Sequence, residues 1–124
     1  KDGLIFHTIL DVAGSARSPY ASDMKRAGLA AAEIVEILPF PDGEPIPTAT
    51  LDVAWHLFRG AEGPMLVQCA AGLSRSASIA YASLRRGWHH SHEKALRRVE
   101  VPMYAGMYPM ARTLASARRW VEGR

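Results

Sequence analysis

The sequence predicts an α/β fold with a central sheet of about four to five strands, mainly parallel or mixed, and helices on both faces. Short apolar runs alternate along the chain with segments whose apolar residues recur at helical spacing, and glycine or proline separates many of them. Strands that alternate with helices favour parallel pairing under helical cover. The length of 124 residues and the hydrophobic content of 48% suffice for one core but not two. We therefore expect a single compact domain over residues 1–124.

Two strands and one helix are predicted in the first third of the chain. Residues 9–13 form a short apolar run that suits a buried strand. A helix over 18–28 follows, with Ser18 as its N-cap. Residues 33–40, EIVEILPF, are a second strand. The three prolines of 41–47 then exclude regular structure and predict a rigid loop.

The middle of the chain predicts a helix and then a strand. Thr48 or Thr50 caps a helix that ends at Gly60. Its apolar residues have the spacing of one helical face: Leu51, Ala54, Trp55 and Phe58. After Pro64, residues 65–69 are too few for a helix and apolar enough for a central strand.

Three further helices are predicted in the last part of the chain. The first carries small apolar residues on most sides and is expected to be buried on more than one face: Ala77, Ala80, Tyr81 and Leu84. Ser91 caps the second, whose apolar residues are Ala95, Leu96 and Val99. The last is marked by Met110, Leu114, Ala117 and Val121.

The charge balance is mildly basic, with 15 Lys and Arg against 12 Asp and Glu and a net charge of +3. This excess suits an anionic substrate, but it is too small to indicate nucleic-acid binding, and no aromatic residues are interleaved with the basic ones. The histidines of WHHSHEK have no cysteine or acidic cluster around them, which favours a solvated turn and helix start. We expect no nucleic-acid partner and no metal.

Cysteine content and hydropathy bear on where the protein resides. A single cysteine cannot form an internal disulfide, so an oxidising compartment is not indicated. No segment reaches the length of about 20 apolar residues that a membrane-spanning helix needs. Residues 1–16 have the outline of a secretory signal, but Asp2, His7 and Asp11 interrupt them, which favours a buried strand. We expect a cytoplasmic monomer with no membrane partner.

The segment 67–78, VQCAAGLSRSAS, lies where a predicted strand meets a predicted helix and contains the only cysteine. At such a helix start, amide groups point outward and the helix dipole favours an anion. The dipole and Arg75 stabilise the thiolate of Cys69, which makes it a nucleophile near neutral pH. Gly72 is free to adopt a positive φ, so the amides before Arg75 converge on one centre while its planar fork holds two phosphate oxygens. The predicted phosphate-binding residues are Ala70, Ala71, Gly72, Leu73, Ser74 and Arg75.

The sequence CAAGLSRS resembles the Cys-x5-Arg-Ser/Thr signature of the protein tyrosine phosphatase superfamily. It is most similar to the dual-specificity branch, whose loop commonly reads Cys-x-Ala-Gly-x-Ser-Arg-Ser. The SASIAYASL that follows is similar to the small-residue helix after that loop. The match is specific over these residues and diffuse elsewhere, and the order of elements from Ile9 to Val121 is compatible with the family's fold.

The resemblance implies that the chain hydrolyses a phosphorylated protein or peptide by two-step phosphoryl transfer. Cys69 attacks phosphorus to give a phosphocysteine, while Arg75 and the amides of 70–75 hold the equatorial oxygens. Ser76 matches the hydroxyl that assists expulsion of the thiolate when water hydrolyses the intermediate. Phosphotyrosine is the expected substrate, with phosphoserine and phosphothreonine as further candidates, and no metal or cofactor is required. Residues 70–74 contain no cation, which favours phosphoproteins over phosphoinositides.

A general acid is also implied, because the leaving oxygen needs a proton and the family places an aspartate on a loop upstream of the cysteine. Asp42, in the proline-rich loop, matches that position, and Glu44 is the reserve candidate. Asp52 is expected to be a first-turn charge near the positive end of a helix instead. Asp11 and Asp23 are expected to be structural.

The sequence departs from the family pattern at two places. Gln68 stands where the family usually has a histidine that orders the loop and tunes the thiol, and glutamine carries no charge. The residues after Val101 lack the Asn or Gln that many members place near the site. Three alternatives stay open: a catalytically silent phosphate-binding module, a phosphatase of a non-protein phosphomonoester, and a sulfur- or arsenate-handling cysteine enzyme.

Overall fold

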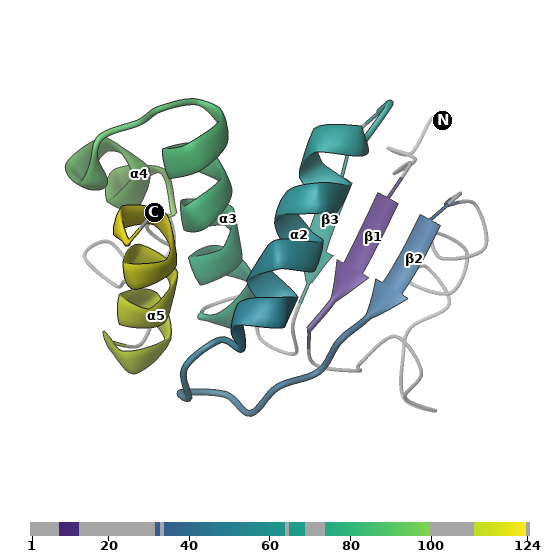
Figure 1. The fold of residues 1–124 in the computed structure, drawn as a ribbon. Coiled ribbons are helices and arrows are strands. Elements are labelled where there is room, and N and C mark those ends of the chain that lie inside the picture. Colours follow the sequence, from purple (N-terminus) through teal and green to yellow (C-terminus); the bar gives the residue numbers. More distant parts are fainter. Residues whose placement is uncertain are drawn as a thin grey trace.

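Three parallel strands form the part of the sheet that the structure describes. The structure is a computed structural model, and it describes residues 8–12, 32, 34–63, 65–68, 74–99 and 111–123. Strand β1 (Thr8–Asp11) pairs in parallel with β2 (Ile34–Ile37) on one side and with β3 (Met65–Gln68) on the other (Figure 1). The register places the last residues of the strands level with one another: Asp11, Ile37 and Gln68. The carboxyl ends of the strands therefore meet at one edge.

The three described strands lie where the apolar runs predicted them, with bounds that differ by a few residues. Their parallel pairing agrees with the predicted fold class. The middle strand among them is β1, all four residues of which are buried, whereas the sequence favoured 65–69 for a central place. The helix predicted over 18–28 lies outside the described residues. Cover of the second face, and a fourth or fifth strand, stay predictions.

Four described helices pack beside this sheet: α2 (Thr48–Gly60), α3 (Arg75–Gly87), α4 (His92–Arg98) and α5 (Ala111–Glu122). In Figure 1, α2 lies in front of β3, and α3 and α5 follow beside it. Helix α3 contacts β3 as well as α2, α4 and α5. This arrangement confirms the prediction that α3 is buried on more than one face.

The two predicted helix starts at residues 48–50 and 91 had different outcomes. The Ser91 hydroxyl accepts the amide of Lys94 at 3.1 Å, which confirms the N-cap of α4. The predicted threonine cap of α2 is wrong, because Pro47 is the N-cap and no side chain caps the helix. The carbonyl of Pro47 accepts hydrogen bonds from the amides of Thr50 and Leu51, at 2.9 and 3.2 Å, so Thr48 is already inside the helix.

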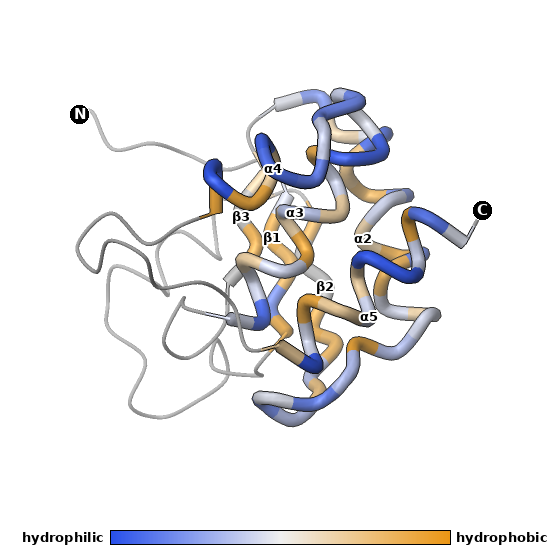
Figure 2. The backbone as a smooth tube through the Cα atoms, turned by 90° about the vertical axis from the view of Figure 1, so that its left-hand side faces the viewer, coloured by the Kyte–Doolittle hydropathy of each residue, from blue (hydrophilic) through white to orange (hydrophobic). Residues whose placement is uncertain are grey.

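The core lies between the sheet and the helices, where Figure 2 shows hydrophobic residues gathered on β1, β3 and the inner sides of the helices. Its largest fully buried members are Leu10, Val12, Ile79 and Tyr81. Arg86 of α3 joins the helices from outside this core. Its guanidinium carbon lies 4.5 Å from the ring centroid of Trp55 on α2 and 4.7 Å from that of Trp120 on α5. Two cation–π contacts thus link three helices.

A polar network joins α3, α4 and α5. The buried Tyr81 hydroxyl lies 2.7 Å from Nδ1 of His92 and accepts a hydrogen bond from Nη1 of Arg85 at 2.9 Å. The same Arg85 nitrogen donates to Oε2 of Glu122 at 2.7 Å, and Nε of Arg118 donates to that oxygen at 3.0 Å. The hydrogen bonds from Arg85 and Arg118 lower the pKa of the Glu122 carboxyl from its usual 4.5.

Replacing Glu122 with glutamine is expected to lower the melting temperature by about 1–4 °C near neutral pH, as for an exposed ion pair. A carboxyl whose pKa is lowered by folding stabilises the protein above its unfolded pKa and loses that contribution as pH falls through its folded pKa. The difference from wild type should therefore shrink below about pH 4.5. Thermal melts across pH measure it. Glu62→Gln, at an exposed position after α2, is the control. An equal loss in both variants would contradict this account.

Candidate active site

The edge at which the three strands end is the place where the sequence analysis put the chemistry. Gln68 is the last residue of β3, one residue before the predicted end of that strand, and α3 begins at Arg75. The chain therefore passes from strand to helix at this edge, with the amide groups of the first turn of α3 facing outward. Cys69 and residues 70–73 lie outside the described residues, and their roles stay predictions.

Arg75 is the residue around which the described part of the site is built. Its Nη1 donates a hydrogen bond to the carbonyl oxygen of Phe40 at 2.9 Å, across 35 residues of sequence. Its Nε lies 3.6 Å from Oδ1 of Asp42. Only 13% of the Arg75 side chain is exposed, against 59% for Asp42. The structure thus brings together the predicted phosphate-binding arginine and the predicted general acid.

The Nε atom of Arg75 is buried and has no hydrogen-bond partner among the residues that the structure describes. The carboxylate of Asp42 is near enough for an ion pair but beyond hydrogen-bond length. A buried donor without a partner is costly, and an anion that approached this edge would remove the cost. A planar guanidinium fixed at one nitrogen by Phe40 is also well placed to bind an oxyanion with the others.

The loop before α2 presents Asp42 through a turn. The amide of Glu44 donates to the carbonyl of Pro41 at 3.3 Å, and Gly43 has φ of 78°. A positive φ at the third residue of such a turn is typical of type II and favours glycine there. The chain before the turn is held against β1, because the amides of Leu38 and Phe40 donate to carbonyls of β1 and the residue after it. Asp42 is therefore on a short turn anchored at its base.

Glu44 and Asp52, the competing acids, have partners on α5. Oε2 of Glu44 lies 3.3 Å from Nη1 of Arg112, and the Glu44 carbonyl accepts a hydrogen bond from Thr113. Oδ1 of Asp52 accepts a hydrogen bond from Nε1 of Trp120 at 2.9 Å. Asp52 is not in the first turn of α2, which contradicts that prediction, because the helix begins at Thr48.

Two serines at the start of α3 are buried. Ser74 and Ser76 are 6% and 9% exposed, and the Ser74 carbonyl accepts the amide of Ser78 at 2.8 Å. Sequence reasoning did not single out Ser78, whose hydroxyl is fully buried and has no hydrogen-bond partner in the described ranges. It also missed the carbonyl of Phe40, because a backbone acceptor leaves no signal in residue type.

The remaining acidic residues and the histidines lie away from Arg75 and Asp42 in the sequence. Asp11 is fully buried at the end of β1, in agreement with a structural place, and Asp23 lies outside the described residues. His89 and His90 lie between α3 and α4, and His92 is the first residue of α4, which agrees with the predicted helix start. The Nε2 atom of His90 is buried, so this segment is not solvated throughout, in contrast to the prediction. None of the helices in the described ranges is long and apolar enough to cross a membrane.

Comparison with solved structures shows which known proteins have a similar fold. No protein-family profile and no curated protein sequence matches the chain. Its structure is similar to that of human DUSP28, with a TM-score of 0.71 and 23% identity over 95% of this chain and 76% of that one.

Two further structures are similar to the same extent. Tk-PTP in the active form has a TM-score of 0.70 and 20% identity over 96% of this chain and 80% of that one. PTPMT1 in complex with PI(5)P has a TM-score of 0.70 and 16% identity over 95% and 78%. The chain has the fold that these dual-specificity and protein tyrosine phosphatases share.

Proposed function

We propose that the chain is a phosphatase that hydrolyses phosphotyrosine in proteins, with phosphoserine and phosphothreonine as further substrates. The observation that carries the proposal is the arginine at the strand edge. Arg75 is fixed by Phe40, faces Asp42 and holds a buried donor that has no hydrogen-bond partner within the described part of the chain. Cys69 lies at the other end of the same Cys-x5-Arg-Ser segment. The fold supports the same chemistry.

In the first step of the proposed reaction, the thiolate of Cys69 attacks phosphorus and forms a phosphorus–sulfur bond. The bond from phosphorus to the leaving oxygen breaks, and that oxygen takes the proton of the Asp42 carboxyl. Arg75 and the amides of residues 70–75 bind the equatorial oxygens, where negative charge is greatest. The alcohol or phenol product leaves with its proton, and the phosphoryl group stays on sulfur.

In the second step, water attacks the phosphocysteine. The phosphorus–sulfur bond breaks, the Asp42 carboxylate takes a proton from the water, and inorganic phosphate and the thiolate of Cys69 are released. Ser76 donates a hydrogen bond to the departing thiolate, which lowers the barrier to its expulsion. Both steps use water and the side chains and amides of this chain. The first step leaves Asp42 as the carboxylate that the second step needs, and the second step returns its proton.

The test of the proposal is hydrolysis by the wild-type chain. An aryl phosphate and matched peptides with phosphotyrosine, phosphoserine or phosphothreonine are expected to release phosphate, fastest from phosphotyrosine. PTPMT1 has a similar fold and was crystallised with PI(5)P, so phosphoinositide vesicles belong in the same assay. Release from the vesicles alone would favour the non-protein phosphomonoester. Phosphate binding without turnover would favour the silent binding module.

Gln68 gives a separate prediction about the reactivity of Cys69. Because Arg75 and the start of α3 stabilise a thiolate, alkylation by iodoacetate is expected to rise with pH at a value below the free-cysteine pKa of about 8.5. Initial rates across pH measure this value. The Gln68→His variant is the matched comparison, since it restores the residue usual in the family. A rate that rises only near the free value would mean that Cys69 is not activated.

A further inference from the structure

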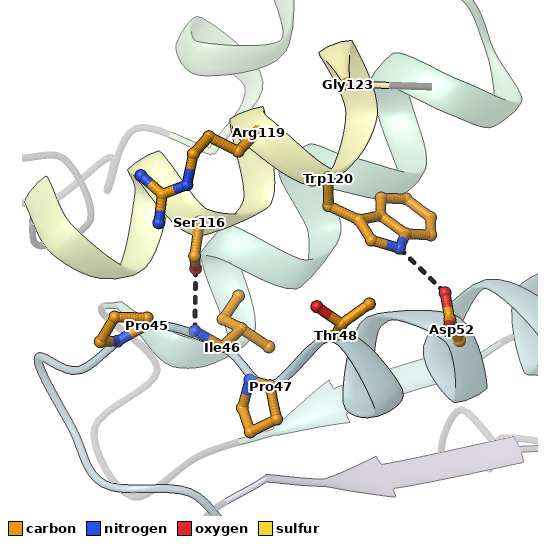
Figure 3. A pocket seen from close by; sticks show the side chains of 9 residues that line it. All are labelled: Pro45, Ile46, Pro47, Thr48, Asp52, Ser116, Arg119, Trp120 and Gly123. Carbon is orange, nitrogen blue, oxygen red and sulfur yellow. Dashed lines mark hydrogen bonds between the residues drawn. The ribbon is translucent and has the colours of Figure 1, made fainter.

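A groove runs along α5 on the side that faces the start of α2 (Figure 3). Its main hollow measures about 700 Å³, and a second hollow of about 450 Å³ shares Pro45 and Arg119 with it. The two hollows therefore form one surface, which we call the α5 groove. The residues that define it are Pro45, Pro47, Arg112, Ser116, Arg119 and Trp120.

The walls of the α5 groove are fixed by hydrogen bonds between them. The hydroxyl of Ser116 accepts the amide of Ile46 at 2.8 Å and donates to the carbonyl of Thr113 at 2.6 Å. At the other end, the indole of Trp120 donates to the carboxylate of Asp52, so the acid that lines the groove already has a partner (Figure 3). The groove is a preformed surface rather than a gap between separate elements.

Positive charge lies at the Pro45 end of the α5 groove, whereas the carboxylate of Asp52 lies at the other end and keeps its negative charge, because the indole that donates to it is neutral (Figure 3). Arg119 is exposed, extends over Pro45 and Ser116 in Figure 3, and has no ion pair or guanidinium hydrogen bond in the described part of the chain. Arg112 is paired with Glu44, but both side chains are about half exposed or more, so the pair is weak and exchangeable. The first turn of α2, which borders the groove, contains no acidic residue. An anionic ligand fits these charges.

The α5 groove lies next to the candidate active site. Pro45 follows Asp42 by three residues, so their Cα atoms are at most about 11 Å apart. An extended peptide advances about 3.3 Å per residue. A peptide with its phosphate at Arg75, beside Asp42, can therefore place a side chain three or four positions away at the end of the groove that Pro45 and Arg119 line.

We propose that the α5 groove binds an acidic side chain of the substrate, three or four positions from the phosphorylated residue, through Arg119. The inference rests on the proposed function, because it specifies the phosphoprotein segments that the site prefers. Arg119 acts here as a specificity-determining residue, while Trp120 and the two prolines contact the apolar parts of the peptide. The preferred substrate is thus an acidic phosphopeptide.

The kinetic test compares phosphotyrosine peptides that carry Glu or Gln at three and four positions on either side of the phosphotyrosine. For wild type, we expect a preference for Glu at one of the tested positions. At that position, KM for the Glu peptide is expected to be about two to five times lower than KM for the Gln peptide, with equal kcat, as for an exposed charge pair. Arg119→Ala should lose this preference, Arg119→Glu should reverse it, and Arg119→Lys should keep most of it. Arg97→Ala, an exposed arginine on α4, is the matched control and should keep it in full. The preference should weaken at high salt.

A binding test separates this proposal from the proposed function. A fluorescent acidic peptide without phosphate should bind wild type and lose affinity in Arg119→Glu, as measured by anisotropy. If aryl phosphate is not hydrolysed but this binding is observed, the proposed phosphatase activity is wrong and the proposed peptide binding in the groove is supported. Equal KM values for Glu and Gln peptides, together with anisotropy unaffected by Arg119→Glu, would overturn the groove. If Arg119→Glu lowers binding to anionic vesicles but not to the acidic peptide, the groove is a membrane-binding surface and the peptide proposal is wrong.

Discussion

The Cys69→Ser variant is expected to hydrolyse aryl phosphate and phosphotyrosine peptides at a rate on the order of 10⁴ to 10⁶ times below wild type. A serine hydroxyl keeps its proton near neutral pH, so the variant has no anionic nucleophile to attack phosphorus. The substitution changes one atom, and it leaves Arg75 and Asp42 in place. Initial rates of phosphate release measure the effect, with far-ultraviolet circular dichroism as the check that the fold is unchanged.

Binding distinguishes a lost nucleophile from a lost site. Cys69→Ser should still bind a phosphotyrosine peptide, measured by calorimetry, because the oxyanion contacts come from Arg75 and the amides of the loop. Arg75→Lys is the matched variant, since a lysine keeps the charge but cannot reproduce the planar fork that donates to Phe40 and faces Asp42. It should lose binding as well as turnover. Turnover by Cys69→Ser near the wild-type rate would exclude the phosphocysteine pathway.

The sequence predicted the periodic elements well, because periodicity reflects burial. The spacing of small residues predicted α3 and its burial on several sides, and that helix contacts β3 and three other helices. The apolar run before Cys69 predicted β3, and the N-cap preference of serine predicted the start of α4, where the Ser91 hydroxyl accepts the amide of Lys94. In each case the residue types themselves determine the local structure.

The start of α2 shows where local rules fail. Threonine is favoured as an N-cap, yet Pro47 takes that place, with φ of −57°. Ile46, the residue before it, is buried in the core and its amide is held by Ser116, 70 residues away. The path of the loop therefore fixes where the helix begins. A preference of one side chain cannot compete with the burial of its neighbour and a tertiary hydrogen bond.

The candidate site was predicted in its residue types and not in its contacts. Asp42 and Glu44 are two residues apart in one loop, and the sequence ranked them without a means of separating them physically. The structure turns Asp42 toward Arg75 and Glu44 toward Arg112. The carbonyl of Phe40, which fixes Arg75, belongs to the backbone and is recognisable only once the segment after β2 is placed beside α3.

This separation of the two acids leads to the second large effect. Asp42→Asn is expected to lower kcat by about 10²- to 10⁴-fold for a phosphate ester with a poor leaving group, because the departing oxygen then receives no proton from the enzyme. Asparagine has the same size and keeps a side-chain oxygen toward Arg75, so KM should change little. Glu44→Gln is the matched control in the same loop, and it should keep kcat because Glu44 faces α5.

The leaving group gives the sharper test of this role. An aryl phosphate whose phenol is strongly acidic departs without much help from a proton, whereas an alkyl phosphate does not. The defect of Asp42→Asn should therefore grow as the leaving group becomes more basic, while Arg75→Lys should be impaired to a similar degree with every leaving group, because the oxyanion is common to all. Kinetics on a series of substituted phenyl phosphates measure both slopes. Equal losses across the series would mean that Asp42 positions Arg75 rather than donating a proton, and a loss in Glu44→Gln instead would transfer the acid role to Glu44.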